Sequence, residues 1–177
     1  MASRKVAARK AAPKKSTSKK ATSKKAGPKK AATKPLDPKQ QLKTLISRLD
    51  PRLQALFGSV RTALRKRFPT ADELVYDYSH SLVIAYSPNG QGIDSPISIA
   101  TRDGGLRLYF NQGPKLPDPK KLLLGSSKLT RFVWIESPKT LMLPEVQAFL
   151  EATLEQSKIP FSPSGSGKLV IKTYSEK

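Results

Sequence analysis

The sequence contains no cysteine, a single histidine and no long hydrophobic run, and each absence narrows the functions open to the chain. Without cysteine, disulfides, thiolate chemistry and cysteine-based metal sites are excluded. The only histidine, His80, has no second histidine or cysteine with which to share a zinc ion, so we expect no zinc site. No apolar run approaches the roughly 20 residues that span a bilayer, and Val6-Ala7-Ala8 is too short for the core of an export signal. We therefore expect a cytoplasmic protein that contacts no membrane.

Known catalytic motifs are also missing. The sequence has no G-x-S-x-G nucleophile motif, no dinucleotide fingerprint and no recognisable pair of catalytic acids. The GSGK stretch at 165–168 lacks the opening glycine of a phosphate-binding loop, and Leu169 stands where a Ser or Thr would hold Mg²⁺. We predict that the protein is not an enzyme and uses no cofactor.

Positive charge, in contrast, is abundant and unevenly placed. The chain has 33 Lys and Arg residues against 13 Asp and Glu, a formal net charge of +20. Thirteen of the basic residues and none of the acidic ones precede Pro35, so the rest of the chain carries 20 basic and 13 acidic residues. The basic residues of this lysine-rich tail form pairs every five residues, at Arg4, Lys5, Arg9, Lys10, Lys14, Lys15, Lys19, Lys20, Lys24, Lys25, Lys29 and Lys30, followed by Lys34.

A five-residue period rotates about 140° per repeat on an α-helix, so the pairs form no amphipathic face. This counts against a membrane-surface helix, which needs a separate apolar side. Prolines and like-charge repulsion further predict that residues 1–35 are disordered. Lysines that meet phosphates release counterions, which drives binding without reading sequence. The tail therefore favours a nucleic-acid partner, bound non-specifically.

The composition of the tail, with AAPKK, KKATSKK and KKAGPKKAAT, resembles the lysine-rich tails of linker histones and bacterial histone-like nucleoid proteins. This resemblance favours DNA over RNA as the partner, without deciding between them, and implies a nucleoid-associated location. Two other interpretations of the tail stay open, a merely solubilising segment and a targeting segment. The oligomeric state cannot be predicted.

After the tail, the sequence predicts one domain over residues 36–160. Asp37-Pro38 and Asp50-Pro51 mark the starts of two amphipathic helices, and Pro144 starts a third. Between them, alternating apolar residues and a DGG hairpin turn at 103–105 predict about five strands. We expect an α+β fold: a two-layer sandwich of an antiparallel sheet with helices at both ends of the domain. Asp118-Pro119 predicts a further short helix. Residues 161–177 are expected to be flexible, with 168–174 either an edge strand or loose.

Residues 108–131, LYFNQGPKLPDPKKLLLGSSKLTR, resemble the signature segment of the YdhG-like domains, a bacterial family of unknown function. The matching positions are Gly113, Leu116-Pro117-Asp118-Pro119, Leu122-Leu123, Gly125, Lys128 and Arg131. The resemblance spans roughly residues 40–156 and implies a two-layer α/β sandwich, compared with frataxin, with iron handling proposed for some members. Iron prefers clustered oxygen ligands, whereas the acids here are scattered, so iron binding is disfavoured.

One polar and aromatic group of residues is a candidate ligand pocket. Its members are Tyr76, Tyr78, His80, Tyr109 and Trp134, near Lys128 and Arg131. They need no ligand if they are ordinary sheet-face residues. The alternative is a small anion bound beside Arg131. The preferred function is thus a YdhG-like domain with a histone-like tail that binds nucleic acid by charge, and the alternative is a small-ligand or iron-handling domain whose tail is incidental.

Overall fold

The computed structural model describes residues 37–173, and it shows the predicted α+β fold. Six strands form one sheet in the order β5-β4-β3-β2-β1-β6, and every neighbouring pair is antiparallel except β1 and β6. The strands are β1 (Asp72–Tyr78), β2 (Ser81–Ser87), β3 (Ile97–Arg102), β4 (Gly105–Asn111), β5 (Thr130–Ile135) and β6 (Leu169–Thr173). The α-helices are α1 (Pro38–Ser47), α2 (Pro51–Arg67) and α3 (Pro144–Glu155), and the 3₁₀ turns are η1 (Gly92–Asp94), η2 (Gly113–Lys115) and η3 (Pro138–Met142).

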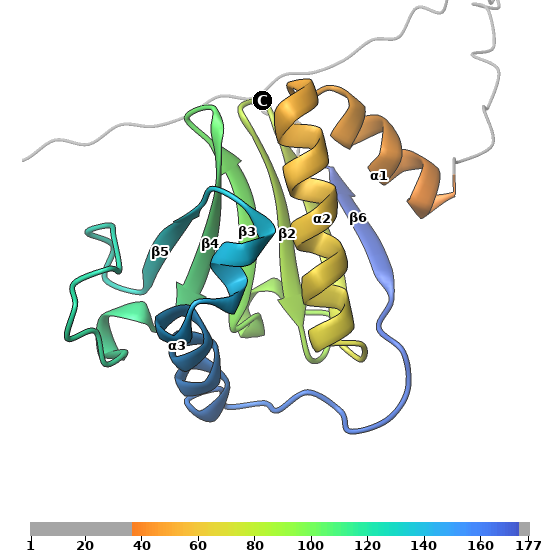
Figure 1. Ribbon diagram of the computed structural model, residues 1–177. Helices are drawn as coiled ribbons and strands as arrows, with labels where there is room; N and C mark the ends of the chain where they lie inside the picture. The colour runs from red at the N-terminus through yellow and green to blue at the C-terminus, as the bar shows by residue number, and fades with distance from the viewer. Residues whose placement is uncertain (1–36, 174–177) are drawn as a thin grey trace, which may run out of the picture. The chain divides into compact units, whose positions relative to one another are not determined.

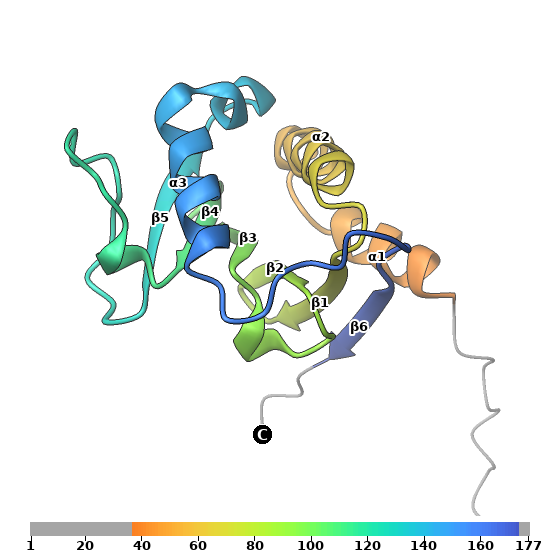
Figure 2. The ribbon, with the colours of Figure 1, turned by 90° about the horizontal axis from the view of Figure 1, so that it is seen from below.

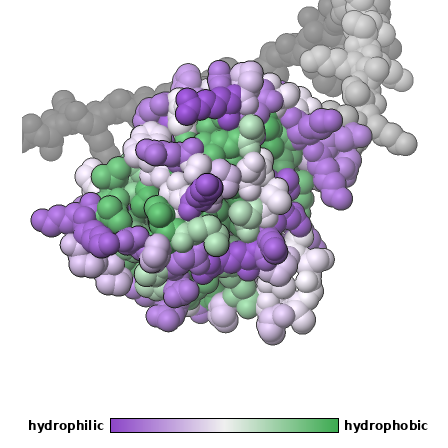
Figure 3. Space-filling model, in the orientation of Figure 1, coloured by the Kyte–Doolittle hydropathy of each residue, from purple (hydrophilic) through white to green (hydrophobic). Residues whose placement is uncertain are grey.

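All three α-helices lie on the same side of the sheet (Figures 1 and 2). The Asp50 carboxylate accepts a hydrogen bond from the Arg52 amide at 2.9 Å and so caps α2, as the Asp-Pro pair predicted. Hydrophilic side chains cover much of the surface on this side, with apolar patches between them (Figure 3). The helices thus make one layer, and the sheet makes the other.

The core lies between these layers because side chains alternate along each strand. One row of paired residues crosses five strands and consists only of buried aliphatic side chains: Val75, Ile84, Ile99, Leu108 and Val133. Apolar residues of α2 and α3 complete the same cluster, among them Phe57, Val60, Leu64, Phe149 and Leu150. We call this side of the sheet the core face and the other side the open face.

The core face also holds a buried charge cluster. Glu73 is 1% exposed, and its carboxylate accepts hydrogen bonds from Arg61 at 2.9 and 2.6 Å and from Arg65 at 2.6 Å. Both arginines project from α2, so the cluster joins this helix to β1. Its neighbour across the strands is Tyr86, whose buried hydroxyl has no hydrogen-bond partner within residues 37–173. Burial, reinforced by the charge of Glu73, raises the pKa of Tyr86.

Strand β6 is the edge strand that was one of two alternatives for residues 168–174, of which the structure describes 168–173. It pairs in parallel with β1, and the Lys168 amide donates to the Asp72 carboxylate at 2.7 Å. The chain approaches β1 so closely that a Cβ at Gly167 would lie 1.8 Å from the Ala71 carbonyl oxygen. The GSGK stretch therefore has a structural role, since its glycine lets the last strand join the sheet.

Local turns include one confirmed and one wrong prediction. Asp103 and Gly104 both have positive φ, at 49° and 73°, as a two-residue hairpin turn requires. The short helix predicted at Asp118-Pro119 is wrong. The Asp118 carboxylate accepts from the amides of Leu122 and Leu123 at 2.9 and 2.8 Å, and thereby folds the chain into a loop.

The residues of the LPDP…LLxG segment have structural roles in this loop. Leu116 is buried, Leu123 packs against the core, and Leu124 forms an isolated antiparallel bridge with Phe132 of β5. Gly113 and Gly125 are the points of closest approach: a Cβ at Gly113 would lie 2.5 Å from the Arg131 amide nitrogen. The segment thus lines the outer edge of β5, which would otherwise be unpaired.

Candidate functional site

The predicted nucleic-acid-binding residues of the tail, Arg4 to Lys34, lie outside the described residues. Their role stays a prediction from charge and spacing. The structure does place the second predicted group, the polar and aromatic residues of the domain, and most of that group lies on the open face of the sheet.

The open face carries a composition unlike that of the core face. Strand alternation and register place on it aromatic, basic and small side chains, with no described α-helix above them. One row of paired residues runs Lys172, Tyr76, Val83, Ala100, Arg107 and Trp134, and the next contains Leu74, Ala85, Ser98, Tyr109 and Phe132. The aromatic residues therefore stand at the two sides of the face, with small residues of β2 and β3 between them.

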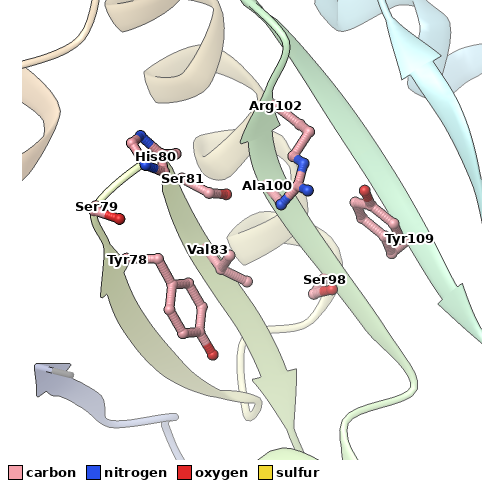
Figure 4. Close-up of a pocket in the computed structure, with 9 residues that line it drawn as sticks. All are labelled: Tyr78, Ser79, His80, Ser81, Val83, Ser98, Ala100, Arg102 and Tyr109. Carbon is pink, nitrogen blue, oxygen red and sulfur yellow. The ribbon is translucent and has the colours of Figure 1, made fainter. Parts of the chain in front are cut away.

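Those small residues form the floor of a groove with a volume of about 420 Å³. Tyr78 of β1 and Tyr109 of β4 stand on its opposite sides, and Val83, Ser98 and Ala100 line the bottom (Figure 4). We call this hollow the tyrosine groove. Its size lies within the range of small-molecule sites, but it is open along one side of the protein.

The guanidinium of Arg102 lies over β3 within this groove, between Ala100 and Tyr109 (Figure 4). Within residues 37–173, Arg102 forms no ion pair and no side-chain hydrogen bond. It is exposed, so its charge is available to a ligand in the groove.

Arg107 has a different environment. Its guanidinium carbon lies 4.3 Å from the Phe132 ring centroid and 4.2 Å from that of Trp134, and it also pairs with Asp103. Cations are attracted to the faces of aromatic rings, so this arrangement holds the two rings in place. The ring of Tyr109 lies 5.3 Å from that of Phe132, which extends the aromatic cluster to the edge of the groove. Trp134 itself remains 37% exposed.

His80 lies in the turn between β1 and β2, where it lines both the tyrosine groove and a second hollow of about 570 Å³. The second hollow is bounded by the α1–α2 corner and the ends of the hairpins. Arg48 and Arg102 line it, but so do the carboxylates of Asp50, Asp77 and Asp103. Arg48 already pairs with Asp77 at 3.4 Å. The mixture of charges gives this hollow no preference for an anion.

The structure separates two of the predicted pocket residues from the rest. Arg131 pairs with Phe110 in the sheet register and so belongs to the core face, where its guanidinium donates to the carbonyls of Ser127 and Thr130. Lys128 lines another hollow, with Lys115 and Lys158. An anion bound beside Arg131 would therefore not contact the open-face residues Tyr109 and Trp134.

Sequence reasoning also missed members of this face, namely Val83, Ser98, Ala100, Arg102, Arg107 and Phe132. Their signal was present in the alternation of the strands. Because side-chain direction has a period of two, Phe132 shares a face with Trp134, and Arg131 shares the opposite one with Val133. The DGG turn then fixes Arg102 opposite Gly105, and this register determines which residues of β3 and β4 share a face.

Across residues 37–173, no three His, Asp or Glu side chains gather closely enough to hold a metal ion. No helix in the same range has the length and apolar character needed to cross a membrane. The sequence matches no protein-family model, no curated protein and no solved structure. The likeness to the YdhG-like segment thus rests on the residues alone.

Proposed function

We propose that this protein associates with nucleic acid through its lysine-rich tail, without reading base sequence. The observation that carries the proposal is the tail itself: thirteen basic residues in regular pairs, with no acidic residue among them. Each phosphate that meets a lysine releases a bound counterion, so the affinity comes from the polyanion and not from its bases. DNA is the preferred partner, in the nucleoid of a bacterial cytoplasm, and the role is non-enzymatic.

The composition of the domain supports the same role. Residues outside the tail still carry 20 basic side chains against 13 acidic ones, so they add attraction for a polyanion. The densest basic stretch, Arg65, Lys66 and Arg67, ends α2, and only part of its charge is paired, by Glu73 and Glu151. Lys66 is exposed, and no ion pair engages it within residues 37–173.

The test is a gel-shift salt titration with duplex DNA of two unrelated sequences. The full chain is compared with a variant in which the thirteen basic residues of the tail are replaced by glutamine. We expect equal affinity for both sequences and a log–log salt slope no steeper than about −12, which flattens strongly in the variant. Unchanged retention of DNA by the variant would contradict the proposed role of the tail.

A small-ligand function is the second candidate, and the tyrosine groove is the observation that favours it. A volume of about 420 Å³ and an unpaired arginine suit a small anionic molecule. A thermal-shift comparison of the full chain with Arg102→Gln, using inorganic phosphate and nucleoside monophosphates, tests this function. Stabilisation by a monophosphate that disappears in the variant would support it, and no stabilisation at millimolar ligand would exclude these ligands.

A further inference from the structure

The open face combines three features: solvent-facing aromatic rings, an arginine without an ion pair within residues 37–173, and a groove between them. Tyr78 and Trp134 are 41% and 37% exposed, although most large apolar side chains of the sheet are buried. Exposed aromatic residues are not needed for the core, which the opposite face of the same strands supplies. The exposed aromatic rings therefore indicate a ligand with flat apolar surfaces.

The spacing of these rings suits such a ligand. Across the strands, Tyr78 and Tyr109 are separated by three strand spacings, roughly 14 Å at 4.8 Å per strand. Along the strands they are offset by a further four residues, because Tyr78 pairs with Ser81 whereas the row of Tyr109 contains Ala85. The residues between them, Val83, Ser98 and Ala100, have small side chains, so a flat ring can descend to the sheet. On the far side of Tyr109, Phe132 and Trp134 continue the aromatic surface. A chain of planar groups could thus lie across the face and contact several rings in turn.

The charges of the face identify the ligand further. Arg102 lies inside the groove and forms no ion pair within residues 37–173. Lys172 of β6 lies beside Tyr76 of β1, with which it pairs across the strands. Lys172 and Arg107 carry positive charge in one row of the face, and Arg102 does so at the end of β3. Asp103 at the hairpin turn pairs with Arg107. A ligand that fits this face therefore has planar rings joined by negatively charged groups. A nucleic acid has this composition, because phosphates link its base-carrying units.

We propose that the open face binds the bases of a single-stranded nucleic acid while the tail engages its phosphates. This inference rests on the proposed function of the tail. Bases stack on aromatic side chains only when they are not already stacked within a duplex, so the face selects single strands. Tyr78, Tyr109 and Trp134 provide the stacking surfaces, and Arg102 contacts a phosphate or a base plane. Every base has a flat face, so this contact is also tolerant of sequence.

Trp134 gives a direct readout, because it is the only tryptophan of the chain and the tail contains no aromatic residue. The experiment uses the full chain and three probes of about 12 nucleotides, which is within the site sizes of single-strand-binding domains: an oligothymidylate, an oligouridylate and a DNA duplex. We expect both single strands to quench the tryptophan fluorescence and the duplex to leave it unchanged at equal occupancy. The affinities of the two single strands decide between DNA and RNA.

Substitutions separate the face from the tail. We expect Tyr78→Ala, Tyr109→Ala and Arg102→Gln each to weaken single-strand binding about tenfold and to leave duplex binding unchanged. Tyr78→Phe, which keeps the ring, should retain wild-type affinity. Met142→Ala is the matched control, since Met142 is a 74% exposed apolar side chain in η3. Unfolding temperatures confirm that each variant folds, and Arg102→Gln changes a side chain that makes no ion pair within residues 37–173.

The outcomes distinguish this inference from the proposed function. Equal binding of duplex and single strand, with no quenching and no effect of Tyr78→Ala or Arg102→Gln, would overturn the role of the face and leave the role of the tail intact. No binding of any probe at low salt would overturn both. Quenching that persists in the glutamine-tail variant at reduced affinity would support the face as an independent contact.

Discussion

The two faces of the sheet are built from the same strands, yet they differ in almost every property. On the core face, buried aliphatic residues such as Ile84 and Leu108 pack beneath helices, and the buried carboxylate of Glu73 is paired with arginines of α2. On the open face, aromatic residues alternate with small and basic ones, and Arg102 has no ionic partner within residues 37–173. Folding requires the first pattern but not the second. Residues of the open face can therefore change to suit a ligand without disturbing the hydrophobic core.

Glu73→Gln should produce the largest change in stability, because it disrupts the charge cluster of the core face. The variant leaves Arg61 and Arg65 without their buried counter-charge. Because these arginines are themselves 24% and 41% exposed, we expect a loss near the lower end of the range for broken buried ion pairs, about 3 kcal/mol. Urea unfolding measures the loss, and Glu136→Gln on the exposed surface is the control. A loss of unfolding free energy below 1 kcal/mol would mean that the ion pairs of Glu73 contribute little to stability although this carboxylate is buried.

Tyr86→Phe should act in the opposite direction. It removes a buried hydroxyl that has no partner within residues 37–173, and an unsatisfied polar group costs about 1–3 kcal/mol. We therefore expect a gain in unfolding free energy of about 1 kcal/mol at neutral pH. Destabilisation by this substitution would show that the hydroxyl has a partner in solution.

The raised pKa of Tyr86 adds a pH dependence that the same variant removes. The folded state keeps the proton above pH 10, the ordinary pKa of tyrosine, whereas the unfolded state releases it. Stability should therefore be complete below pH 10 and fall above it by about 1.4 kcal/mol per pH unit for this group. Unfolding curves of Tyr86→Phe and the wild type at neutral and alkaline pH test the sign, since the difference between them should grow with pH.

Arg107→Gln tests the open face and should have a smaller effect on stability. It removes a cation that lies 4.3 and 4.2 Å from two ring centroids, an interaction worth about 0.5–2 kcal/mol. We expect a loss of about 1 kcal/mol together with a change in the fluorescence of Trp134. Stability that falls while the spectrum stays constant would mean that Arg107 does not set the position of this ring.

The smallest effect should come from a pair outside both faces, Lys120 and Glu145. The hydrogen bond from Lys120 lowers the pKa of Glu145. Its contribution to stability is therefore present above the unfolded pKa and is lost as the pH falls through the folded one. Because Lys120 is exposed and Glu145 is only half-buried, water screens the pair, and we expect Lys120→Gln to change the acid-unfolding midpoint only slightly, as measured by circular dichroism.

Much of the fold could be predicted because its signals are local. The Asp-Pro pairs begin α1 and α2 at Pro38 and Pro51, and the apolar alternation and the DGG turn identify β1 to β5. The Asp118 loop could not be told from a helix start, since the same carboxylate can cap either one. The structure excludes the helix, because Asp118 accepts from amides four and five residues ahead and Lys121 has a positive φ of 54°.

The candidate site was predicted less well because it depends on pairing between strands. The sequence grouped Arg131 with Trp134 by proximity, although their positions in β5 differ by an odd number and place them on opposite faces. Arg102 and Ser98 became members of the site only through the register of β3 against β2 and β4. The parallel pairing of β6 with β1 depends on contacts across 96 residues, for which a local pattern contains no signal.

That distant pairing has a consequence for how the protein is made on the ribosome. One edge of β1 pairs with β2, which follows closely in the sequence, but the other edge stays unmatched until residues 169–173 have left the exit tunnel, long after the basic residues near the start have emerged. The nascent chain therefore presents a cationic arm while its sheet still has an unpaired strand edge, a state that is prone to wrong pairing with neighbouring chains. Like-charge repulsion between such arms would keep those chains apart until the last strand is added.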